Sequence, residues 1–419
     1  GVFLVARLYP VFFTGFDILG TGSNLITIIG GITIIIAAAL AFVQNDIKKV
    51  LAYSTVSQLG YMMMGLGAGA WTPAVFHIFT HAFFKACLFL CAGSISHSAS
   101  HHSFDMKKDM GGLRKFMPIT FTTWIISTLA LCGVFPFSGF FSKDEIIDNV
   151  GHNGYNTFMI IGLIGAFMTA AYMTRATYLT FFGTPRGAAA GEHHEEHGAH
   201  DTHAVAHVTT HDAHDPQVPH YEDDSHAASG PHESGLLITV PLIILATLAL
   251  SSGLLNATPF GESWERIKTW VEPSAVVVMA ASSDGHSAEA SGEAATSEAG
   301  TSEDGHHESP CGSETPKDGV CYAPQLNHAP FKWSKAAVSL IIVFAGLVIS
   351  WLVCVALYTR KDKRLVGLTQ RNAVLRGGYR LLDNKYYLDA LYENVIVKAI
   401  AGPIAAGAYW FNQHILDGI

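Results

Sequence analysis

Long apolar runs separated by short polar stretches cover most of this chain. An apolar helix of about 20 residues crosses a bilayer, and the pattern therefore predicts an all-α polytopic membrane protein, a bundle of about eight transmembrane helices. The spans are expected at 1–15, 24–43, 50–69, 76–96, 118–134, 156–182, 236–254 and 335–358. Between and after them lie a His-rich polar loop, an Ala/Ser/Glu-rich polar loop and a basic stretch.

The span at 76–96 carries His77, His81 and Lys85 at a constant spacing of four residues. Residues spaced in this way lie along one slowly winding stripe of an α-helix. A cation at membrane depth usually faces a bundle interior or a wet cavity, where burial favours the neutral amine, and histidine exchanges protons near neutral pH. The stripe therefore predicts a ladder of proton-carrying groups. The alternative is packed core histidines with Lys85 snorkelling to an interface.

The fifth span is interrupted at Gly133, Pro136 and Gly139 and is followed directly by Lys143 and Asp144. Proline removes a backbone donor and glycine lowers helix propensity, so a discontinuous helix is expected. Transporters use such breaks at their binding sites. Lys143 and Asp144 are therefore candidates for proton transfer, and an ordinary helix end with surface charges is the alternative.

The third span has a polar face that includes Ser54, Gln58 and Tyr61. Asp46 and Lys48 occupy the polar corner that precedes it. We assign Asp46, Lys48, Ser54 and Tyr61 to a secondary proton path or to proton uptake. For Asp46 and Lys48 the competing interpretation is that they only determine topology.

The positive-inside rule assigns the cytoplasmic side to Lys48 and Lys49, the 107–115 loop and the 360–380 stretch, which all fall on one side if the spans alternate. The His-rich loop then faces the cytoplasm and the Ala/Ser/Glu-rich loop the opposite compartment. There Cys311 and Cys321 are expected either to form a disulfide or to remain free thiols.

Composition changes this picture little. Only 14% of the 419 residues are charged, which is low for a soluble protein, and most of the acidic excess behind the net charge of −9 lies in the two polar loops. The six cysteines form no CxxC pair, and the histidines of the His-rich loop are irregularly spaced. We therefore predict no metal site, and no nucleotide-binding or flavin-binding motif is present.

The last segment, 386–419, has an apolar side, with Asp389 and Glu393 one turn apart. This pattern is typical of an amphipathic helix that lies along a membrane surface, and a ninth span is the alternative. Because the chain starts within an apolar run and stops within a patterned segment, we expect a fragment of a larger subunit.

Four stretches carry a family resemblance: VQNDIKKVLAYSTVSQLGYMMMGLG, FHIFTHAFFKACLFLCAGS, MGGLRKFMP and GFFSKDEI. In this order they resemble the antiporter-like subunits of respiratory complex I, a superfamily shared with Mrp-type antiporters. Lys143 within GFFSKDEI and the tail NKYYLDALYENVIVKAI favour the L-type (subunit five) chains. The match covers roughly residues 1–180, and the two polar loops have no counterpart in it.

This resemblance implies a second discontinuous helix, the one that carries His77, His81 and Lys85. It also implies a proton-translocating membrane-arm subunit of an NADH–quinone oxidoreductase, with NADH, FMN, iron–sulfur clusters and quinone in partner subunits and no redox centre in this chain. The expected partners are the neighbouring antiporter-like subunit and the lipid bilayer, not nucleic acid. The expected location is the bacterial cytoplasmic membrane, with an organellar energy-transducing membrane as the alternative.

Two other functions stay open at this point: the large subunit of an Mrp-type sodium/proton antiporter, and a structural scaffold of the membrane arm. The expected organisation is a proton-channel half at 1–182, a His-rich loop at 183–235, a span at 236–256, an Ala/Ser/Glu-rich loop at 257–334, a span at 335–358, a basic linker at 359–385 and the start of the horizontal helix at 386–419.

Overall fold

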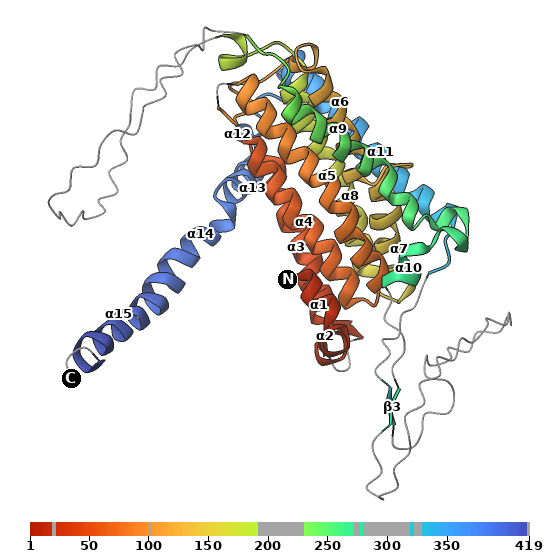
Figure 1. The fold of residues 1–419 in the computed structure, drawn as a ribbon. Helices are drawn as coiled ribbons and strands as arrows, with labels where there is room; N and C mark the ends of the chain where they lie inside the picture. Colours follow the sequence, from red (N-terminus) through yellow and green to blue (C-terminus); the bar gives the residue numbers. More distant parts are fainter. Residues whose placement is uncertain are drawn as a thin grey trace, which may run out of the picture.

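The computed structural model describes residues 1–18, 22–100, 102–191, 230–271, 277–279, 319–321 and 329–416. Long helices form a bundle, and the C-terminal helical segment projects from it (Figure 1). The α-helices are α1 Val2–Arg7, α2 Tyr9–Gly15, α3 Leu25–Val43, α4 Ile47–Gly67, α5 Trp71–Ser98, α6 Pro118–Cys132, α7 Glu145–His152, α8 Asn156–Phe181, α9 Leu236–Ser251, α10 Arg266–Val271, α11 Trp333–Cys354, α12 Leu368–Arg371, α13 Ala373–Asp383, α14 Leu388–Leu391 and α15 Gly402–Phe411. The strands are β1 Asp17–Ile18, paired antiparallel with β2 Ser23–Asn24, and β3 Val277–Met279, paired antiparallel with β4 Gly319–Cys321.

Six helical segments of the described residues are long and apolar enough to cross a membrane. They are Leu25–Val43, Trp71–Ser98, Asn156–Phe181, Leu236–Leu255, Trp333–Thr359 and Lys385–His414. The predicted count of eight is not confirmed. Residues 1–15 form the two short helices α1 and α2, Pro118–Cys132 is a shorter apolar helix, and the polar face of α4 lowers its hydropathy.

Helices α3 and α4 approach each other through glycine. A Cβ atom on Gly30 would lie 2.4 Å from the backbone nitrogen of Met64, and one on Gly60 would lie 2.9 Å from the carbonyl oxygen of Gly30. Small residues allow this close backbone approach between membrane helices, where lipid gives no hydrophobic drive for association. The contact fixes the rotation of α4 and hence the direction of its polar face.

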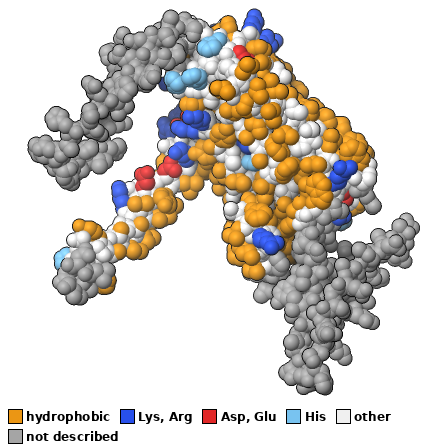
Figure 2. Space-filling model, viewed as in Figure 1, with side chains coloured by type: hydrophobic (Ala, Val, Ile, Leu, Met, Phe, Trp, Pro, Cys, Tyr) orange, Lys and Arg blue, Asp and Glu red, His pale blue; other side chains and the backbone are white. Residues whose placement is uncertain are grey.

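The outer surface of the bundle is apolar, as Figure 2 shows for the face in view. Side chains such as Ile29, Ile244 and Phe344 are about half exposed. The core beneath is closely packed around Trp124, which is fully buried and donates a 2.8 Å hydrogen bond from Nε1 to Thr177 Oγ1. A surface of this kind suits contact with lipid hydrocarbon.

Helix α6 ends at Cys132, and Gly133 follows in the left-handed region with φ of +80°. Helical structure resumes with the π-helix η2, Phe140–Asp144, which continues into α7. A Cβ on Gly139 would lie 1.8 Å from the carbonyl oxygen of Ala130, so only glycine fits where the two arms of the interruption touch. Pro136 lies between them, after a cis peptide bond with Phe135.

Helix α5 differs from the expectation. It runs from Trp71 to Ser98 as one α-helix, so the second discontinuous helix that the family resemblance implied is not observed. Its length of 28 residues allows one continuous helix to carry all three groups of the predicted ladder.

The C-terminal segment extends away from the bundle (Figure 1). It continues from α14 through the π-helix η9, Tyr392–Ala401, into α15 and η10, Asn412–Leu416, and its described side chains are all exposed. By length and composition Lys385–His414 also qualifies as a membrane span. Its orientation along the membrane therefore stays a prediction.

Candidate functional site

The stripe on α5 points into the bundle. His77 is 0% exposed, His81 9% and Lys85 5%. His77 connects three elements, because its Nδ1 lies 2.8 Å from the Ser142 hydroxyl on η2 and its Nε2 lies 3.2 Å from Gln58 Oε1 on α4. The predicted stripe is therefore an internal one, with histidine at the junction between α4 and the interruption after α6.

Lys85 is held by α4. Its Nζ donates to the Ser54 hydroxyl at 2.7 Å and to the Leu51 carbonyl at 3.2 Å, and Tyr172 of α8 donates to the same Ser54 hydroxyl at 2.7 Å. Because the amine ends among buried hydroxyl and carbonyl groups, the snorkelling alternative does not describe this side chain.

Lys143 occupies the π-helix η2 and is 2% exposed. Its Nζ lies 3.5 Å from Thr169 Oγ1 on α8 and 4.5 Å from the centroid of the Tyr61 ring on α4. Tyr61 in turn donates from its hydroxyl to the Gly162 carbonyl at 2.6 Å. This geometry allows a cation–π contact, so Lys143 has a partner in its charged form without a carboxylate.

Side chains along one side of helix α4 contact all three of these groups, and we call this side the α4 wall. Ser54 bonds Lys85, Gln58 bonds His77 and Tyr61 contacts Lys143. The three wall residues follow an i, i+4, i+7 spacing, which places them along one side of the helix. The polar face predicted from sequence therefore lies against both lysines and the central histidine.

Two buried nitrogen atoms of this cluster have no hydrogen-bond partner among the described residues: His81 Nε2 and Gln58 Nε2. Buried polar groups are normally satisfied by protein or by ordered water. The rings of His77 and His81 are 5.9 Å apart between centroids, a separation that water can bridge. The site is thus suited to hold water between its titratable groups.

Asp46 and Lys48 are separate from this cluster. Asp46 caps the N-terminus of α4, accepting a 3.1 Å hydrogen bond from the Lys49 backbone nitrogen, and Lys48 lies over the Phe104 ring at 3.4 Å. These contacts are structural ones at the helix end. Of the secondary residues predicted, only Ser54 and Tyr61 contact the buried lysines.

Asp144 follows Lys143 and lines a pocket of about 240 Å³ between η2, α7 and α11. Sequence reasoning missed Ser142, Thr80, Thr169 and Tyr172 as members of the cluster. A hydroxyl residue in an apolar span is a weak signal, because it usually bonds the backbone of its own helix, as Thr169 also does.

Cys311 lies outside the described residues, so the disulfide to Cys321 stays a prediction, as does any function of the two polar loops. Within the described ranges, no group of three or more His, Cys, Asp or Glu side chains is arranged to hold a metal ion.

Known proteins resemble the chain in its first part most clearly. Residues 1–169 match the family model described as NADH:quinone oxidoreductase/Mrp antiporter, TM. The chain is 44% identical over 271 residues to NAD(P)H-quinone oxidoreductase chain 5 of Picosynechococcus sp., covering 63% of this chain and 37% of the relative. It is 32% identical over 419 residues to NADH-quinone oxidoreductase subunit L of Neisseria meningitidis, covering 98% of this chain and 51% of the relative.

A solved structure of the Mrp complex from Dietzia sp. aligns with a TM-score of 0.49 and 22% identity, covering 64% of this chain and 50% of that one. The chain spans about half or less of the length of the curated relatives described above.

Proposed function

This chain is homologous to subunit L and chain 5 of NADH–quinone oxidoreductases and carries their antiporter-like membrane region in residues 1–169, and on that premise we propose that it translocates protons within such a complex. Lys85, His81, His77, Lys143 and Asp144 are the proton-transfer groups in this proposal. The redox groups (NADH, FMN, iron–sulfur clusters and quinone) belong to partner subunits, and the neighbouring antiporter-like subunit is the expected membrane partner.

One observation carries the proposal: two buried lysines and a histidine between them all contact the polar side of α4. A lysine in such a site can exchange its proton because burial favours the neutral amine and no carboxylate pairs with it in the described contacts. Imidazole can both accept and donate a proton, so His77 can connect the two amines through Ser142 and water.

A proton then moves along these groups in sequence. It leaves the Lys85 ammonium for the imidazoles of His81 and His77, passes through the Ser142 hydroxyl and water to the Lys143 amine, and leaves on the side of Asp144. No electron moves in this chain. A unit charge shifted by partner subunits to about 8 Å from a buried lysine changes its energy by roughly 2 kcal/mol at an effective dielectric constant near 20, enough to reverse the proton occupancy.

The test is Lys85→Ala in the full-length protein, in inverted vesicles of its native membrane. We expect NADH-driven, quinone-dependent proton uptake to collapse while NADH oxidation through an artificial acceptor shows that the complex is assembled. Unchanged uptake would contradict the proposal. If Lys85→Ala instead loses sodium-driven pH exchange and keeps NADH-driven uptake, the chain belongs to an Mrp-type antiporter. If the complex fails to assemble with Lys85→Ala but assembles and takes up protons normally with Lys85→Met, the role of Lys85 is that of a scaffold.

A further inference from the structure

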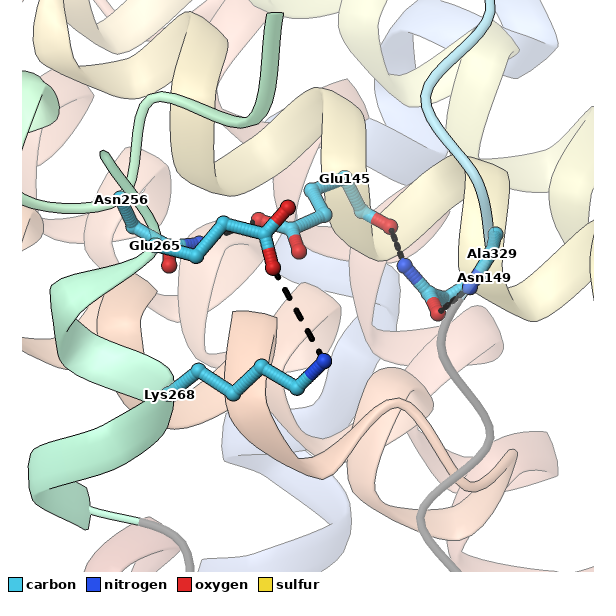
Figure 3. Close-up of polar contacts among 6 residues, drawn as sticks. All are labelled: Glu145, Asn149, Asn256, Glu265, Lys268 and Ala329. Carbon is cyan, nitrogen blue, oxygen red and sulfur yellow. Dashed lines mark hydrogen bonds and ion pairs between the residues drawn. The ribbon is translucent and has the colours of Figure 1, made fainter. Parts of the chain in front are cut away.

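Beyond Lys143 and Asp144 the chain presents a second carboxylate, Glu145, at the first residue of α7. The segment between α9 and α10 folds over it. Asn256 of that segment donates from Nδ2 to Glu145 Oε2 at 2.8 Å, across 111 residues of sequence. Glu265 points toward the same carboxyl group and acts on it electrostatically, while Lys268 lies 3.8 Å from Glu265 (Figure 3).

Asn256 is 1% exposed, and its Oδ1 has no hydrogen-bond partner among the described residues. One end of this amide therefore donates to Glu145 while the other offers an unused acceptor beside the carboxylates. A buried acceptor of this kind requires a proton donor, which a water molecule or a protonated carboxyl group supplies and an anion does not.

The same carboxyl group borders an opening. Glu145 lines the 240 Å³ pocket together with Asp144 and Asp148, and Lys335 of α11 forms a 2.5 Å ion pair with Asp148 at its wall. Helices α7 and α10 lie at the end of the bundle opposite α12 and the basic linker (Figure 1). Glu145 follows the buried Lys143 by two residues, a spacing that turns the two side chains to different sides of the helix. Its carboxyl group therefore faces the pocket at the far end, and Lys143 faces the buried cluster.

We propose that Glu145, held by Asn256 and faced by Glu265, is the group that receives the proton from Lys143 and releases it on this side. This inference rests on the proposed function and names its release site. The N–H bond of the Lys143 ammonium breaks, an O–H bond forms on the Glu145 carboxylate through bridging water, and the proton then passes to solvent in the pocket. No electron or further reactant is required.

The charges around Glu145 favour a carboxyl group that can hold a proton for a time. Glu265 and Asp144 repel its anion, and Asp148 in turn repels that of Asp144. Neighbouring carboxylates do not both ionise readily. The hydrogen bond from Asn256 and the charge of Lys268 beside Glu265 favour the anion. Lys335, paired with Asp148, and Lys332 lie at the pocket wall. Because both signs are present, Glu145 can load and release a proton within one cycle.

The experiment measures NADH-driven proton transport by the full-length protein in inverted vesicles whose interior, the release side, is buffered over a series of pH values. We expect Glu145→Gln to slow transport about tenfold or more and to remove its dependence on internal pH, and Glu145→Asp to restore part of both. The matched control is Glu233→Gln, a carboxyl group hydrogen-bonded to the start of α6, which should leave both readouts unchanged.

Transport and pH dependence that stay normal in Glu145→Gln, while Lys143→Met stops transport, would overturn this inference and leave the proposed function standing. If Lys143→Met also transports normally, the proposed function itself fails. Should Glu145→Gln not assemble, Glu265→Gln decides the question: its side chain is 24% exposed, so assembly is expected, and an unshifted internal-pH profile would refute the release site.

Discussion

Replacing Ser142 with alanine is the sharpest perturbation of the central contact. Its hydroxyl lies 2.8 Å from His77 Nδ1 and 2.8 Å from Thr80 Oγ1, all at buried positions. Losing a buried hydrogen bond costs about 0.5–1.5 kcal/mol net and up to about 3 kcal/mol when the partner stays unsatisfied. If the loss of the His77 contact alone raises the barrier to proton transfer by about 1–2 kcal/mol, the transfer slows roughly 5- to 30-fold.

The assay is NADH-driven proton uptake in inverted vesicles, normalised to NADH oxidation with an artificial acceptor. The matched control is Ser57→Ala, since Ser57 is equally buried but its hydroxyl has no partner among the described residues. We expect Ser142→Ala to slow uptake and Ser57→Ala to leave it near the wild-type rate. Wild-type uptake in an assembled Ser142→Ala complex, or equal slowing by both changes, would refute the reasoning.

Three further predictions concern stability and packing. Gly139→Ala should prevent assembly, because its Cβ would lie 1.8 Å from the Ala130 carbonyl oxygen, whereas Gly93→Ala, with open space around it, should assemble normally; membrane levels by immunoblot check both. Glu233→Ala removes hydrogen bonds from the first turn of α6 and should cost about 0.5–2 kcal/mol, visible as a lower denaturation temperature of the purified complex. Tyr172→Phe removes the 2.7 Å hydrogen bond to the Ser54 hydroxyl and should lower the same temperature by the equivalent of about 1 kcal/mol; no change in either temperature would contradict these assignments.

The sequence predicts the buried stripe well, because helical spacing alone places His77, His81 and Lys85 on one side of α5. It also predicts that α4 has a polar side, and the interruption around Pro136 follows from local backbone chemistry. These features depend on residues close together in the chain, where the geometry of one helix is sufficient.

The partners across helices could not be predicted in the same way. Ser142 meets His77 across 65 residues, and Asn256 meets Glu145 across 111 residues. Hydropathy predicts the face that a helix buries. The rotation of one helix against another depends on contacts such as that of Gly30 in α3 with the backbone of α4, which only the folded chain reveals. The number of spans could not be predicted for a related reason: the polar side chains of α4 lower its hydropathy, and α4 is not among the six candidate spans of the described residues.

We propose that the buried groups along α4 conduct protons. The most direct measurement is the number of protons translocated per NADH oxidised in inverted vesicles that carry Lys143→Met in the full-length protein, with assembly verified by artificial-acceptor activity. We expect this ratio to fall below the wild-type value, because in the proposed path the proton reaches the release site only through the Lys143 amine, which lies beside Tyr61 and Thr169. A ratio equal to that of the wild-type complex would contradict it.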